Sequence, residues 1–160
     1  MSELTTIEVA DPVPLAGALF EQCFGSPMPD FPRHFILQAR LAESAPLSLG
    51  YVHFTKVDNF YLGGGMCIDT RAFRKLPRSA RTQLARRGGA AFSMLSAAVA
   101  RLDDCDAVFG YVGNRLAYRI DLAAGFEQTR YKHLIVYWKT PLDAAERVRI
   151  VEAANRCGPF

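Results

Sequence analysis

Long apolar runs and paired cysteines are missing from this sequence of 160 residues. No apolar run approaches the ~20 residues that a membrane-spanning helix needs, so we expect no membrane association. The cysteines lie far apart and form no C-x-x-C pair, which argues against zinc and redox motifs. We therefore expect no bound metal, and reduced, mostly buried thiols at Cys23, Cys67, Cys105 and Cys157.

A basic leader is also absent. The first residues, MSELTTIEVADPV, have no positively charged region followed by a long apolar one, so they do not resemble a secretory signal. A cytoplasmic location is the default expectation. An apolar content of 50% with 22% charged residues is typical of a globular protein, and this length favours one domain with a sizeable core.

Acidic residues are missing from one long segment. Between Asp69 and Asp103 there is no Asp or Glu, although the net charge of the whole chain is only +3. The basic residues of this segment are Arg71, Arg74, Lys75, Arg78, Arg81, Arg86, Arg87 and Arg101. Such a segment can attract the phosphates of a nucleotide cofactor or of a nucleic-acid backbone; the alternative is a solvated loop and helix face.

The order of the predicted elements indicates a mixed α/β fold around one sheet. Apolar periodicity predicts strands at 4–9, 34–41, 47–54, 59–69 and 107–112, then one long strand or two short ones within 126–138. It predicts helices at 15–24, 88–102, 114–125 and 140–158, the last with Thr140 as its cap. Segment 70–87 is predicted as a basic connection with a helical turn or two after Pro77. The helices from Gly88 and Asn114 link strands as crossovers, so part of the sheet should be parallel.

Three consecutive glycines interrupt the fourth strand. Gly63, Gly64 and Gly65 would normally weaken a strand, so they indicate a bulge or the close approach of another backbone or of a ligand.

The helix NRLAYRIDLAAGF contains one residue that its apolar pattern does not require. Asn114 is a good N-cap and Gly125 a good terminator, and the residues between them repeat at three-to-four spacing. Asp121 lies at the edge of the apolar stripe, with no basic residue three or four positions away to pair with it.

Two motifs carry a resemblance to a known family. The run Arg86 to Ala91 is similar to [Q/R]-x-x-G-x-[G/A], with Arg86, Gly89 and Ala91 in register. About 25 residues later, Asn114, Ala117, Gly125 and Phe126 match N-x-x-A-x-x-x-Y-x-x-x-G-F. With the element order, these motifs resemble the GNAT superfamily of CoA-dependent acyltransferases over roughly Leu4 to Trp138. The segment Thr70 to Ala85 departs from the family as an insertion.

The resemblance implies a fold and a reaction. It implies a mixed sheet of about six strands that splays between the fourth and fifth strands, with helices on both faces. Residues 1–140 would form the acyltransferase domain, and 141–160 an extra C-terminal helix that could pack against a second copy of the chain. The implied activity is N-acyl transfer, in the first instance of acetyl, from acetyl-CoA or another acyl-CoA to an amine that the sequence does not identify.

The resemblance also implies cofactor-binding residues. Glycines, a helix N-terminus and arginines together suit a pyrophosphate, and a backbone N–H near Ile68 would polarise the thioester carbonyl. The implied CoA contacts are Met66, Cys67, Ile68, Arg86, Arg87, Gly88, Gly89, Ala90, Ala91, Asn114 and Ala117.

Asp121 occupies the position of the family's tyrosine, a general acid for the leaving thiolate. A phenol, with a pKa of ~10, stays protonated at neutral pH, whereas a carboxyl does so only if burial raises its pKa to near neutrality. Four interpretations remain. In the first, the thiolate leaves unprotonated or is assisted by Tyr118 or Tyr111; in the second, Asp121 acts as an ionised base or amine anchor. In the third, the fold binds CoA esters with little or different catalysis; in the fourth, Asp121 is a solvated surface residue.

Two more residues are catalytic candidates, each with a structural alternative. His53 either faces the acceptor site or is a hydrogen-bonded core histidine. Asp69 is either a base for the amine or a turn-capping aspartate.

Two alternatives to the amine acyltransferase stay open. One is a nucleic-acid-modifying protein of the same fold that uses the basic segment Arg71 to Arg87. The other is a non-catalytic CoA-binding protein.

Overall fold

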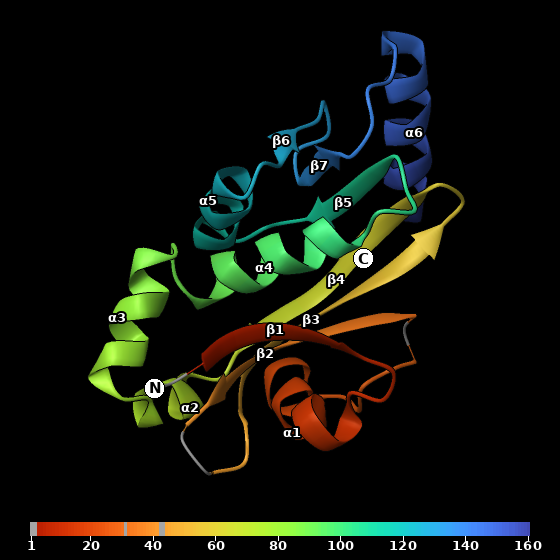
Figure 1. Ribbon diagram of the computed structural model, residues 1–160. Coiled ribbons are helices and arrows are strands. Elements are labelled where there is room, and N and C mark those ends of the chain that lie inside the picture. The colour runs from red at the N-terminus through yellow and green to blue at the C-terminus, as the bar shows by residue number, and fades with distance from the viewer. Residues whose placement is uncertain (1–2, 31, 42–43) are drawn as a thin grey trace. The chain divides into compact units, whose positions relative to one another are not determined.

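The structure is a computed structural model, and it describes residues 3–30, 32–41 and 44–160. Its strands are β1 (Glu3–Val9), β2 (Arg33–Arg40), β3 (Leu47–Val57), β4 (Phe60–Ile68), β5 (Ala107–Tyr111), β6 (Glu127–Gln128) and β7 (Leu134–Trp138). Its helices are α1 (Val13–Phe24), α2 (Thr70–Lys75), α3 (Arg78–Arg86), α4 (Ala90–Arg101), α5 (Arg115–Ala123) and α6 (Ala144–Cys157) (Figure 1). Within the described ranges no helix is both long and apolar enough to cross a membrane.

The predicted mixed α/β fold is confirmed, with seven strands in the order β1-β2-β3-β4-β5-β7-β6. β4 and β5 pair in parallel, while the pairs β1–β2, β5–β7 and β6–β7 are antiparallel. The seventh strand arises because segment 126–138 folds as two short strands. Pairing of β4 with β5 covers Phe60–Gly63 and Ala107–Gly110, and β4 runs on to Ile68. The predicted split between the fourth and fifth strands lies where this pairing ends.

The chain forms two compact units. The first unit comprises Met1–His53 and Gly65–Ala98, and the second comprises Phe54–Gly64 and Val99–Phe160. Strands β3 and β4 each contribute residues to both units.

Helices cover both faces of the sheet within the first unit. On one face, the rings of Phe20 in α1 and Tyr51 in β3 have centroids 5.9 Å apart. On the other, a Cβ added at Gly50 would lie 3.3 Å from the sulfur of Met94 in α4. Because neighbouring residues of a strand point to opposite faces, α1 and α4 lie on opposite sides of β3.

The core of the second unit is formed by strands and the C-terminal helix. Phe60 and Phe109 meet edge to face, with ring centroids 5.4 Å apart. Ile150 and Ala154 of α6 are buried in the same cluster, so the C-terminal helix is part of this core.

Two predicted boundaries were wrong. Segment 70–87 contains two helices rather than a turn or two, because the Asp69 carboxylate caps α2 by accepting from the N–H groups of Arg71 and Ala72. The last helix begins at Ala144, where Asp143 caps it. Thr140 is not the cap, because its hydroxyl donates to Asp106 at 2.7 Å.

The thiols and the glycine run also differ from expectation. Cys67 and Cys105 are buried, but Cys23 and Cys157 are exposed on α1 and α6, so the thiols are not mostly buried. The close approach predicted at the glycine run is made by the protein itself. A Cβ at Gly65 would lie 2.4 Å from the Phe24 ring, and one at Gly63 would lie 3.2 Å from the Phe109 carbonyl oxygen.

Candidate functional site

The turn between α3 and α4 uses two glycines in the left-handed region. Gly88 has φ +91 and Gly89 has φ +95, values that L side chains rarely adopt. The N–H groups of Arg87, Gly88 and Gly89 all donate to carbonyls at the end of α3. The glycine N–H groups therefore close α3.

The unused donors belong to the first turn of α4. The first helical hydrogen bond of α4 runs from the Ser93 N–H to the Gly89 carbonyl, at 3.0 Å. The N–H groups of Ala90, Ala91 and Phe92 precede it, and the first N–H groups of a helix have no partner within the helix. With the positive end of the helix dipole, these N–H groups make this end of α4 suited to binding an anion.

Arginines reinforce the potential there. Arg86 and Arg87 are exposed, and one guanidinium nitrogen of Arg87 donates to the Leu4 carbonyl at 3.3 Å. This contact ties Arg87 to β1 and leaves Arg86 as the more available cation.

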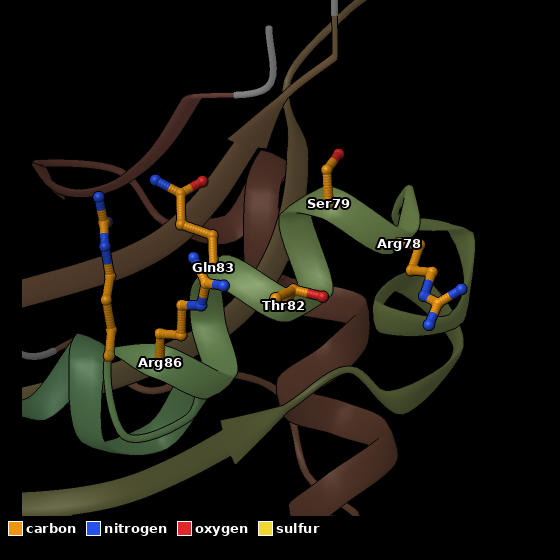
Figure 2. Close-up of a pocket in the computed structure, with 6 residues that line it drawn as sticks. Arg78, Ser79, Thr82, Gln83 and Arg86 are labelled. Carbon is orange, nitrogen blue, oxygen red and sulfur yellow. The ribbon is translucent and has the colours of Figure 1, made fainter.

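A basic groove runs along α3. We call it the α3 groove; its volume is about 530 Å³ and its lining residues are Arg78, Ser79, Thr82, Gln83, Arg86 and Arg87. Figure 2 shows Arg78, Thr82 and Arg86 on successive turns of the helix. The neutral donors Ser79, Thr82 and Gln83 were missed by the sequence interpretation. The signal was available, because residues four apart on a helix share a face.

The strand segment Met66–Ile68 places one predicted cofactor contact inside the core. Met66 and Ile68 are half-buried, whereas Cys67 is buried in a cluster with Phe20 and Tyr51. Burial raises the pKa of the Cys67 thiol to about 12, so it is not an activated nucleophile. The next N–H, that of Asp69, is already used because it donates to the Leu49 carbonyl.

His53 lies in the core, and Asp69 is the N-cap of α2. His53 is buried against the rings of Phe20 and Tyr51, and burial lowers its pKa to about 4, so it is neutral at physiological pH. The Asp69 carboxylate caps α2. Both candidates lie in the first unit, with Met66–Ile68 and Arg86–Ala91.

Helix α5 carries the remaining candidates, in the second unit. Its predicted cap is confirmed: the Asn114 side chain accepts from the N–H groups of Leu116 and Ala117, at 2.8 and 3.1 Å. Its predicted terminator is confirmed too, because Gly125 has φ +109. Tyr118 lies one turn before Asp121 on the same face of the helix and is half-buried.

Asp121 is the buried polar residue of α5. It is 7% exposed, so the interpretation as a solvated surface residue was wrong. Within the described residues its carboxylate has no hydrogen bond or ion pair. Burial raises its pKa to about 6. At that value the carboxyl changes protonation state near neutral pH, as a proton-transfer group requires.

The comparisons with known proteins bear on the fold. No family model and no curated protein matches the chain. Among solved structures, it is similar to the ribosomal-protein-S18-alanine N-acetyltransferase from Escherichia coli, with 12% identity, a TM-score of 0.54, and coverage of 90% of this chain and 97% of that chain. A weaker likeness is the KacTA–DNA complex, with 15% identity, a TM-score of 0.48, and coverage of 98% and 100%. Another is YhhK from Escherichia coli bound to coenzyme A, with 14% identity, a TM-score of 0.42, and coverage of 85% and 98%. The first likeness confirms that the chain has the predicted GNAT fold.

Burial of Asp121 gives a testable pH dependence of stability. The pKa of Asp121 is higher in the folded than in the unfolded protein. Its contribution to the free energy of unfolding is therefore most favourable in acid and is lost as the pH rises through about 6. We expect Asp121→Asn to match the wild type near pH ~4 and to exceed it at pH ~8 by on the order of 1–2 kcal/mol, allowing for solvent screening. Urea denaturation at both pH values measures this, with the exposed Asp103→Asn as the control. A difference that does not change with pH would contradict it.

Proposed function

We propose that the chain is an N-acyltransferase that moves an acyl group, in the first instance acetyl, from acyl-CoA to an amine. The observation that carries this proposal is the anion-binding end of α4. It presents three first-turn N–H groups next to Arg86, in a segment without any acidic residue.

The residues present fit the phosphates of CoA. A pyrophosphate needs several fixed N–H donors and positive charge, and both are found between Arg86 and Phe92. Gly89 keeps the approach open, because a Cβ there would meet no atom within 4 Å. Bound acyl-CoA would supply an activated thioester, while the chain would hold its phosphates and exclude water. Met66 and Ile68 remain candidates for contacts with the pantetheine arm.

Asp121 is our candidate proton donor for the leaving thiolate. A carboxyl with a pKa of about 6 is half protonated at that pH, and a thiolate is the stronger base, so the transfer runs downhill. The Asn114, Ala117, Gly125 and Phe126 register supports this role, because it puts Asp121 where the family keeps its acid. Tyr118 is the alternative donor.

The first test separates phosphate binding from the rest of the reaction. We expect Arg86→Gln to lower kcat/KM for acetyl-CoA by about 10- to 100-fold, the loss typical of one charge-assisted hydrogen bond. Acetyl-pantetheine lacks the pyrophosphate, so kcat/KM for it should not change. Release of the free thiol over a panel of amines measures both.

Arg81→Gln is the matched control, because Arg81 is exposed on the same helix but does not line the α3 groove. An equal loss with acetyl-pantetheine would remove Arg86 from the phosphate site. Thermal stabilisation by acetyl-CoA without release of thiol to any amine would favour the non-catalytic alternative.

The second test concerns Asp121. If its carboxyl donates the proton, kcat should fall about tenfold per pH unit above pH ~6, because only the protonated form is active. Asp121→Tyr should move this fall to higher pH, and Asp121→Asn should lower kcat throughout. Tyr118→Phe is the control from the same face of α5. If both Asp121 variants match the wild type while Tyr118→Phe loses activity, the donor is Tyr118.

The α3 groove favours a second candidate function, in which the acceptor amine is carried by a nucleic acid. Its arginines Arg78 and Arg86 stand about two turns apart, with hydroxyl and amide donors between them, and phosphate backbones are bound by such donors. Phe73 is the one aromatic residue within 71–87, so base stacking contributes little and binding would depend on charge.

This candidate predicts salt-dependent binding of RNA or DNA. The logarithm of affinity should fall linearly with the logarithm of salt, and Arg78→Gln should reduce that slope by about one. Fluorescence anisotropy with a labelled oligonucleotide measures this, with Arg115→Gln on α5 as the charge-matched control. No binding at ~50 mM salt would remove the candidate.

A further inference from the structure

Two cysteines of the first unit lie side by side. Cys23 is exposed near the end of α1, and Cys67 is buried in β4. The Cys23 thiol is close enough to interact with the Cys67 thiol and adds to the effect of burial on its pKa. Both thiols are free in the structure.

The packing of α1 on β4 holds them together. Phe20, Cys23 and Phe24 share one face of α1, being three and four residues apart. Gly65 and Cys67 share one face of β4. The Phe24 ring lies over Gly65, since a Cβ there would be 2.4 Å from it. Phe20 packs in the same cluster as Cys67. Cys23, between the two phenylalanines, is therefore held against Cys67.

We propose that Cys23 and Cys67 form a reversible disulfide when the protein meets an oxidising small-molecule disulfide such as glutathione disulfide. The observations behind this proposal do not depend on the proposed acyl transfer. Its product would join the end of α1 to the strand segment Met66–Ile68.

The reaction takes two exchange steps. The exposed Cys23 thiolate attacks one sulfur of glutathione disulfide, which forms a mixed disulfide and releases one glutathione thiolate. The Cys67 thiol then loses its proton, and its sulfur attacks the Cys23 sulfur and displaces the second glutathione. Both protein sulfurs are oxidised, glutathione disulfide is reduced to two glutathiones, and the two protons from the cysteines go to them. Burial of Cys67 makes the second step the slower one.

The test is to incubate the wild-type protein with excess glutathione disulfide and to identify linked peptides by mass spectrometry without reduction. We expect a peptide pair joined by Cys23 and Cys67 that disappears on adding dithiothreitol. The oxidised protein should melt about 5–10 °C higher than the reduced protein, because the bond closes a long loop.

Variants and an internal control complete the experiment. In the Cys67→Ser variant, the mixed disulfide between Cys23 and glutathione should persist, because no second thiol resolves it. In the Cys23→Ser variant, glutathione should not become attached to the buried Cys67. Cys157 is the internal control, because it is exposed like Cys23 and its sulfur contacts the Ala153 carbonyl of its own helix at 3.4 Å. A stable Cys23 adduct in the wild type, or a Cys23 link to a second chain, would overturn the proposal.

Discussion

The hydrogen bonds of the turn at Gly88–Gly89 determine which groups the first unit offers to an anion. Two consecutive residues with positive φ let the chain reverse at once from α3 into α4. The reversal uses the turn's own N–H groups to satisfy carbonyls of α3. The next three N–H groups, from Ala90 to Phe92, are left at the helix start. The turn itself thus uses the N–H groups of both glycines, and the first N–H groups of α4 follow directly after it.

Asp121 is a polar residue at a buried position of α5, where its side chain makes no hydrogen bond or ion pair with the described residues. Burial of a carboxylate removes part of its hydration, and this one gains no hydrogen bond among the described residues in return. This partial loss of hydration raises the pKa of the Asp121 carboxyl. Polar residues that violate local packing rules concentrate at functional sites, where the cost is offset by chemistry. A proton-transfer role gives this residue a reason that packing does not.

The sequence predicted most of the fold and less of the site. Periodicity located the strands and the main helices, and the cap at Asn114 was read correctly from residue type. Helix α2 was missed and the length of α3 was underestimated because a basic run was interpreted by charge. The overlooked signals were structural: the capping Asp69 and the buried Ala80 and Leu84. Burial of Asp121 could not be predicted, since it is a charged residue type at the edge of the apolar stripe. Residue type also does not reveal which N–H groups of the Gly88–Gly89 turn donate to carbonyls of α3.

The last glycine of the run in β4, Gly65, shows how packing within the first unit determines which side chains meet. Glycine weakens a strand, but it leaves space for another group to approach the backbone closely. At Gly65 the Phe24 ring occupies that space. The contact fixes the end of α1 on β4, and it thereby determines which residue of α1 meets Cys67. An alanine at Gly65 would require the Phe24 ring to move. Gly65 thus makes room for packing within the protein itself. The residues that follow it in β4 carry the reactive or accessible groups: Cys67 interacts with the Cys23 thiol, and Met66 and Ile68 are half-buried.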